Sequence, residues 1–112
     1  MTKNVSKNTI APEERHETVR RYIMALLEEY TLSAREIARY LKIPEKDVPN
    51  HMAHIKKTMN RLERQLIIIS ARCEQCGFVF KKRDRLTTPG KCPICKGRFI
   101  TPILFKIIRT HE

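Results

Sequence analysis

Four cysteines constrain the fold of this chain more than any other feature of the sequence. They form two pairs, Cys73-Glu-Gln-Cys76 and Cys92-Pro-Ile-Cys95, with fifteen residues between the pairs. Each C-x₂-C turn brings two thiolates to one side of a hairpin, and two such turns complete a tetrahedron. The spacing therefore predicts a small all-β ribbon over 71–112. Its metal ligands are Cys73, Cys76, Cys92 and Cys95.

Four thiolates suit either zinc or iron. Zinc is the expected ion, one per chain, because four-cysteine zinc sites commonly stabilise small folds and nothing else in the sequence suggests electron transfer. All four ligands come from the protein, so no coordination position stays open and the metal should be structural. Iron is the alternative metal. Two disulfides are the alternative chemistry, which is rare in a reducing cytoplasm.

The expected location follows from the apolar segments. The first residues are polar and contain no apolar stretch of the kind that a signal peptide needs. The aliphatic run at 66–69 is too short to cross a bilayer. We therefore expect a cytoplasmic protein without a membrane partner.

The charge of the chain points to a polyanionic partner. The 112 residues carry 23 basic and 12 acidic side chains, for a net charge of +11. Residues 65–112 are the more basic part, with ten basic and three acidic side chains. A soluble basic protein without such a partner is the alternative. The length allows one ordinary domain or two small units, and small units need a metal or a docking partner to be stable.

Two helices joined by a short turn are predicted between Ser33 and Leu62. Ser33 and Glu36 form a capping box, and Pro44 ends the first helix because proline removes a backbone donor. Val48, Met52, Ile55, Met59 and Leu62 then repeat at spacings of four and three, which is typical of an amphipathic helix. This arrangement indicates a helix-turn-helix. An earlier helix from Pro12 to Tyr30 should pack across both, after a disordered tail at 1–11.

The outer face of the second helix is polar and basic. At about 100° per residue, the apolar side chains fall within roughly 40° of one line and a set of polar side chains falls on the opposite side. That set comprises Asn50, His54, Lys57, Arg61 and Arg64, with Ala53 among them. Amide and basic groups on an outer helix face suit base edges and phosphates. A solvated basic face is the alternative, and His51 is expected at the edge of the core.

Two residues depart from the usual helix-turn-helix pattern. The turn after Leu41 often needs a positive φ, and Lys42 stands there at a cost of roughly 1 kcal/mol. Pro49 fits only if the second helix begins at Val48, with Asp47 as its N-cap, because proline is tolerated in a first turn.

The remaining segments read as strands and a loop. Residues 66–70 are rich in β-branched side chains, and 78–80, 98–100 and 103–108 are further strand candidates. We expect the last of these to pair with 66–70 as an enlarged wing. Lys81, Lys82 and Arg83 begin a basic loop that either binds phosphates or is simply solvated.

These motifs together resemble one family. The capped helix at Ser33–Leu41, the segment from Pro44 to Ile55, and the pairs Cys73–Cys76 and Cys92–Cys95 look like the predicted prokaryotic transcriptional regulators that fuse a winged helix-turn-helix to a rubredoxin-like zinc ribbon. The resemblance covers about residue 12 to the end. It implies an α+β fold, with a three-helix winged helix-turn-helix at 12–70 and a zinc ribbon at 71–112. It also implies DNA binding through the helix at 48–64 and zinc at the four cysteines.

The predicted function is that of a sequence-specific, double-stranded DNA-binding transcriptional regulator. The alternatives are an interaction adaptor, whose ribbon docks on a transcription or RNA-processing assembly, and an iron-binding redox protein. No catalytic constellation or small-molecule effector site is identifiable, so we expect a non-enzyme. Tyr22, Leu27 and Tyr30 could form a homodimer contact, with core packing as the alternative.

Overall fold

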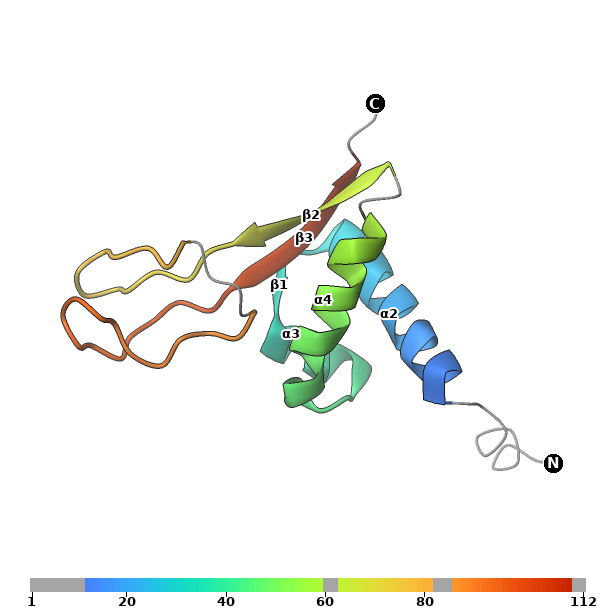
Figure 1. The fold of residues 1–112 in the computed structure, drawn as a ribbon, viewed down its shortest axis with the longest axis horizontal. Helices are drawn as coiled ribbons and strands as arrows, with labels where there is room; N and C mark the ends of the chain where they lie inside the picture. Colours follow the sequence, from blue (N-terminus) through green and yellow to red (C-terminus); the bar gives the residue numbers. More distant parts are fainter. Residues whose placement is uncertain (1–11, 60–62, 82–85, 110–112) are drawn as a thin grey trace.

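The computed structural model describes residues 12–59, 63–81 and 86–109. In chain order the elements are α2 (Pro12–Glu29), β1 (Leu32–Ser33), α3 (Ala34–Leu41), the 3₁₀ turn η1 (Glu45–Asp47), α4 (Val48–Met59), β2 (Arg64–Ile69) and β3 (Leu104–Arg109). Within the described ranges, three α-helices thus precede an antiparallel hairpin, and the fold is of the mixed α+β class (Figure 1). No helix among the described residues is long and apolar enough to cross a membrane.

The strands form one small antiparallel sheet in the order β1-β3-β2. β3 lies in the middle, so Phe105 faces Leu32 of β1 on one side and Ile68 of β2 on the other. The sequence suggested that 103–108 would pair with 66–70, and β3 does run antiparallel beside β2. β1 was not predicted, because two residues are too few to show the alternation that marks a strand.

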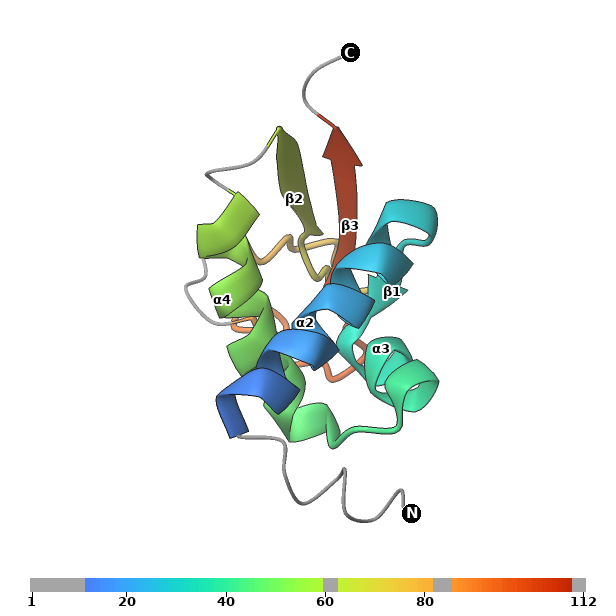
Figure 2. The same ribbon diagram turned by 90° about the vertical axis from the view of Figure 1, so that its right-hand side faces the viewer.

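The helices pack on one face of this sheet, with α2 crossing α4 (Figure 2). Alternation along β3 turns Phe105 and Ile107 towards the helices, where both are buried, and leaves Ile108 exposed. The buried apolar cluster comprises Ile23, Leu27, Leu32, Ile37, Ala38, Val48, Met52, Ile55, Met59, Ala71, Ile103, Phe105 and Ile107. Every helix and every strand of the sheet contributes to this cluster or packs against it, so the core holds α4 at a fixed position.

The turn between α3 and η1 has the strained geometry that its sequence requires. The capping box is present, since Ser33 Oγ accepts from the N–H of Glu36 and Glu36 Oε1 accepts from the N–H of Ser33. At the other end Lys42 adopts φ +57° and ψ +47°, the left-handed conformation that glycine usually supplies. The N–H of Ile43 then donates to the carbonyl of Ala38 at 3.1 Å, which closes a Schellman-type turn.

The start of α4 differs in detail from the sequence prediction. The helix begins at Val48, as predicted, and Pro49 lies in its first turn, where no backbone donor is lost. Asp47, however, ends the 3₁₀ turn η1, and its N–H donates to the carbonyl of Pro44 at 3.0 Å. The chain therefore enters α4 through a continuous helical turn instead of an Asp47 N-cap.

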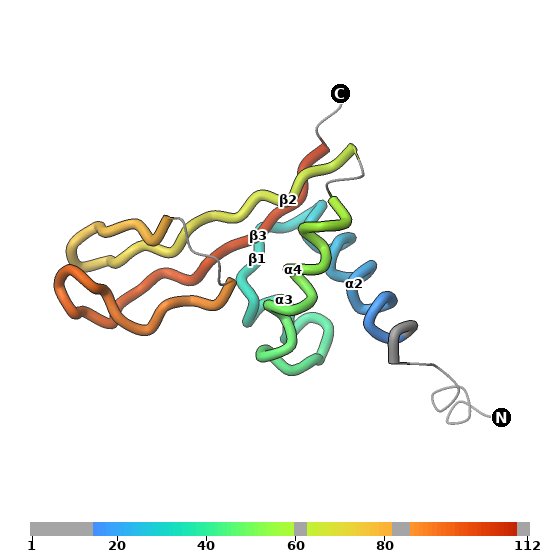
Figure 3. Tube along the Cα trace, viewed as in Figure 1, coloured from blue at the N-terminus to red at the C-terminus, as the bar shows by residue number. Residues whose placement is uncertain are grey.

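The cysteine-containing segment is inserted between β2 and β3. It leaves the sheet after Ile69 and returns at Leu104, so that it extends the β2–β3 hairpin away from the helices (Figure 3). Among its described residues, isolated bridges join Arg72 to Val79 and Cys73 to Ile100, and single backbone hydrogen bonds flank these bridges. The strands predicted at 78–80 and 98–100 are thus single bridges, because the chain turns at the cysteines before a ladder can form.

Candidate metal centre and candidate nucleic-acid interface

The four cysteines converge at the far end of the inserted segment. Their Sγ atoms all lie within 4.8 Å of one another. Cys73 and Cys95 Sγ are 3.6 Å apart, as are Cys76 and Cys92 Sγ. A tetrahedron with metal–sulfur bonds of about 2.3 Å has an edge of about 3.8 Å. The sulfur positions therefore fit a tetrahedrally coordinated metal ion.

The two cysteine turns share one backbone pattern. In the first, Cys73 donates to the carbonyl of Phe78 at 2.8 Å and Gly77 donates to Cys73 at 2.9 Å. In the second, Cys92 donates to Gly97 and Lys96 donates to Cys92, both at 2.9 Å. Both turns thus hold two sulfurs on the same side of a tight loop, as a shared metal requires.

The residue four positions after the first cysteine of each turn is left-handed. Gly77 has φ +83°, and Lys96 has φ +64°. Gly97, the next residue after Lys96, does not have a positive φ and has a different role. A Cβ at Gly97 would collide with the side chain of Gln75 and would lie 3.2 Å from Cys95 Sγ. Gly97 therefore leaves room for the side chain of Gln75 from the first turn, although this exposed side chain could also turn away.

The sulfurs influence one another's ionisation. The backbone N–H of Cys76 lowers the pKa of Cys73 to about 7, with help from the N–H of Gln75. For Cys76 the backbone N–H of Phe78 acts in the same direction, but burial and the neighbouring thiols outweigh it and raise its pKa to about 12. One thiolate therefore forms easily while another resists forming beside it. A divalent cation among the sulfurs removes this conflict, because it favours every thiolate at once.

The exposed face of α4 carries part of the predicted DNA-contacting set. Asn50, His54 and Lys57 are exposed, together with Ala53, and the opposite face is buried through Val48, Met52, Ile55 and Met59. The helix thus presents an amide, an imidazole and an ammonium group to solvent. Arg61 lies outside the described residues.

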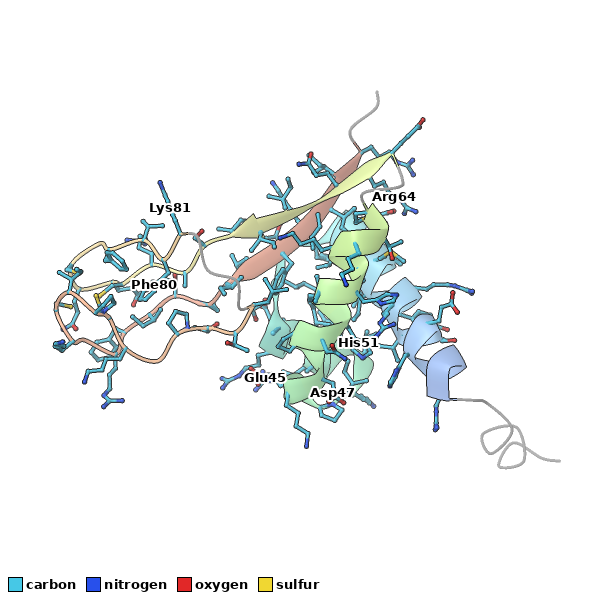
Figure 4. All side chains as sticks on the ribbon, viewed as in Figure 1. Glu45, Asp47, His51, Arg64, Phe80 and Lys81 are labelled. Atoms are coloured by element: carbon cyan, nitrogen blue, oxygen red, sulfur yellow. The ribbon has the colours of Figure 1, made fainter. Side chains whose placement is uncertain are left out.

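Arg64 has a different position from the one predicted. α4 ends at Met59, and Arg64 is the first residue of β2. Its guanidinium forms an ion pair with Glu28 of α2, near the upper end of the sheet in Figure 4. The predicted helix to residue 64 is therefore wrong at its C-terminal end, because the β-branched run begins to pair with β3 already at Arg64.

Among the residues of the predicted basic loop, the structure describes only Lys81. It is exposed on the inserted segment, well away from His51 and the start of α4 (Figure 4). Lys82 and Arg83 lie outside the described residues. The structure therefore does not bring Lys81 together with Asn50, His54 or Lys57.

His51 belongs to a polar cluster beneath the N-terminal part of α4. It is 5% exposed, and its Nδ1 accepts a hydrogen bond of 3.1 Å from Arg20 Nε of α2. The ring of His16 meets it edge-on, with centroids 5.5 Å apart. Burial, followed by the charge of Arg20, lowers the pKa of His51. The imidazole is therefore neutral and joins α2 to α4, in agreement with its predicted place at the edge of the core.

A groove that the sequence did not suggest separates the helices from the inserted segment. It has a volume of about 510 Å³ and continues into a second hollow of about 290 Å³. Its walls come from the start of α3, from η1 and from residues 87–102, with Lys46 on one side and Thr88 on the other. No sequence signal links these segments, because only the tertiary fold brings them together.

Of the three residues predicted for self-association, two are exposed and one is buried. Leu27 is buried in the core, so it cannot contact a second copy. Tyr22 and Tyr30 are exposed, and Tyr30 stacks on Tyr40 of α3 with ring centroids 6.2 Å apart.

Two protein families match successive parts of the chain. Residues 18–67 match a family described as "PF0610-like, N-terminal", and residues 70–110 match one described as "PF0610 rubredoxin-like zinc beta-ribbon domain". No curated protein matches. The solution NMR structure of protein PF0610 from Pyrococcus furiosus is similar, with 35% identity and a TM-score of 0.72, over 83% of this chain and 90% of that one. The chain therefore belongs to the PF0610 family, as a PF0610-like N-terminal domain followed by a rubredoxin-like zinc β-ribbon.

Proposed function

We propose that this protein is a sequence-specific DNA-binding regulator of transcription, built as a winged helix-turn-helix whose wing carries a zinc ribbon. The order of helices and strands supports this reading. α3 and α4 form the helix pair, and the hairpin of β2 and β3 occupies the place of a wing directly after the second helix.

The exposed face of α4 is the observation that carries the proposal. Asn50 and His54 lie on the first two turns, and Lys57 lies one turn later. A helix that enters the major groove reads base edges with its N-terminal residues and approaches the backbone further along. Asn50 suits adenine, whose N6 and N7 groups match an amide, and Lys57 suits a phosphate. No acidic side chain lies within α4, so nothing on the helix repels the duplex.

The proposed metal is one structural zinc ion per chain. In the part of the inserted segment that the structure describes, few apolar side chains are buried and strand pairing is limited to isolated bridges, so we expect its shape to depend on the four sulfurs. Metal binding and folding are then the same free energy for this part of the chain. Zinc orders the enlarged wing, and the wing in turn is continuous with the sheet that supports α4.

We infer a binding protein and not an enzyme. The four thiols are all occupied as metal ligands in this proposal, and the buried histidine on α4 has a structural partner in Arg20. The exposed groups of α4 suit recognition, because no nucleophile and base lie within reach of each other there.

Selection from a random pool of DNA duplexes tests the proposal. The zinc-loaded protein should enrich one motif, and its affinity for that motif should fall with rising salt. Lys57→Ala should reduce the slope of log K against log salt by about one phosphate contact. Lys56→Ala is the matched control: it removes the same charge one residue earlier, outside the proposed face, and should leave the slope nearly unchanged. Selection that enriches no motif, or equal effects of the two variants, would contradict the assignment of α4.

A further inference from the structure

We propose that the second cysteine turn of the ribbon is a docking surface for an acidic protein segment that carries apolar side chains. The surface consists of Lys91, Ile94, Lys96, Arg98 and Phe99, and we call it the knuckle surface. It is independent of the α4 face, because the second cysteine turn lies at the tip of the inserted segment, which extends away from the helices in Figure 1.

Two large apolar side chains of this surface are exposed to solvent. Ile94 and Phe99 are each 65% exposed, more than any other large hydrophobic residue that the structure describes. Phe99 cannot turn inward without breaking local pairing, because its carbonyl accepts from the N–H of Glu74 at 2.8 Å and the next residue, Ile100, bridges to Cys73. Ile100 packs against the core instead. Single exposed apolar side chains are common on protein surfaces, so these two are significant only together, as the apolar part of one rigid and basic turn.

The backbone that carries these side chains is held in place by its own hydrogen bonds. The turn is closed by the hydrogen bonds from Cys92 to Gly97 and from Lys96 to Cys92, and Cys95 Sγ lies 3.6 Å from Cys73 Sγ. A partner therefore meets a pre-ordered surface and loses little affinity to ordering the protein.

The charge of the knuckle surface selects a negative partner. Lys91, Lys96 and Arg98 are all exposed. The sequence contains no acidic residue between 86 and 109, and Glu74 is the one acidic side chain of the inserted segment that the structure describes. Cations next to exposed apolar residues in the same turn complement a segment that alternates carboxylates with apolar side chains.

The exposed apolar residues favour protein over nucleic acid. The α4 face combines its cation with polar groups and only Ala53, which suits the polar surface of DNA. On the knuckle surface, phosphates would neutralise the cations but would leave the aliphatic side chain of Ile94 uncovered. Phe99 alone could stack on an unpaired base. A protein segment covers both residues, and aromatic residues and arginine are enriched at protein interfaces.

Fluorescence anisotropy of the zinc-loaded full chain tests this inference with four probes at physiological ionic strength. The first is a labelled peptide that alternates Asp or Glu with Leu or Phe. The second replaces its acids with Asn and Gln, and the third replaces its apolar residues with Ser. The fourth is a single-stranded oligo-dT. We expect saturable binding of the first peptide and binding at least about tenfold weaker for the other three.

Paired variants locate the site. Ile94→Ser combined with Phe99→Ser should weaken the first peptide about tenfold or more. The control pair Ile69→Ser and Ile108→Ser removes exposed apolar side chains from the sheet and should have no effect. Asn50→Ala should also have no effect, which separates this site from the α4 face. Zinc content of each variant shows that the ribbon is intact.

Three results would overturn the inference. They are an absence of saturable binding to the first peptide, equal effects of the two variant pairs, and tighter binding of oligo-dT that depends on Phe99. The last result would assign the surface to single-stranded nucleic acid.

Discussion

Replacing Lys42 with glycine should stabilise the protein, because this lysine occupies a backbone conformation that side chains disfavour. Its φ of +57° and ψ of +47° place it at the centre of the left-handed region. That conformation costs an L-residue roughly 1–2 kcal/mol, whereas glycine adopts it freely. Glycine also gives the unfolded chain more freedom, which offsets part of the gain. We expect a net stabilisation of about 1 kcal/mol.

Urea unfolding of the zinc-loaded protein measures this effect. With a slope typical of small proteins, about 1–3 kcal/mol/M, the midpoint should rise by roughly 0.3–1 M without a change in slope. The matched control is Lys46→Gly, an exposed lysine in η1 with a negative φ. It should lower the midpoint, because glycine in a helical turn costs about 0.5–1 kcal/mol. A midpoint for Lys42→Gly that is unchanged or lower would refute the left-handed turn between α3 and η1.

Three further predictions concern the metal, the buried histidine and self-association. Elemental analysis should find about one zinc per chain, and a strong chelator should abolish the dispersed amide signals of 71–81 and 86–103. A metal-free preparation with an intact ribbon would contradict the metal centre. Retention of iron over zinc, with visible absorption, would favour the redox alternative. The pKa of His51 is lowered in the folded state, so the unfolded state binds a proton more readily below pH 6.5 and the free energy of unfolding should fall as the pH drops through that value. His51→Gln should flatten this decline. An unaltered decline would show that other groups cause it. Sedimentation at micromolar concentration should detect a dimer that Tyr22→Ser and Tyr30→Ser weaken, whereas a monomer both with and without DNA would count against self-association.

Local signals made the helical part of the fold predictable. The capping box of Ser33 and Glu36 and the apolar periodicity after Val48 depend on residues a few positions apart, and the structure contains both. The strained backbone at Lys42 was also predictable, since the turn needs a positive φ and the sequence has no glycine at that position. In each case the physical cause lies in residues of one helix or of the turn that ends it.

Features that depend on distant residues were harder to predict. β1 forms because β3 offers it a partner about seventy positions later, and its two residues contain no periodicity. Arg64 matched the helical spacing of Lys57, but its pairing with β3 and its ion pair with Glu28 place it in the sheet. A periodic pattern alone does not show where a helix gives way to a strand that has a tertiary partner.

The metal cluster could likewise be predicted from local sequence, whereas the knuckle surface could not. The spacing of the cysteines defined the metal cluster, because two short turns carry all of its ligands. The knuckle surface was not found in the sequence, since Ile94 and Phe99 resemble ordinary core residues until the fold shows both of them in water. Exposure is a tertiary property, and sequence alone does not reveal it.

The affinity of Asn50→Ala for two duplexes tests most directly the claim that α4 reads DNA sequence. On the selected motif this variant should lose roughly 1–3 kcal/mol, about 5–150-fold in affinity, and on random duplex it should lose little. Gln65→Ala is the matched control, because it removes an exposed amide from β2, away from the helix. We expect a large loss of affinity for Asn50→Ala on the motif alone and none for Gln65→Ala on either duplex. Equal affinity of Asn50→Ala and the unaltered protein for the selected motif would contradict sequence reading by α4.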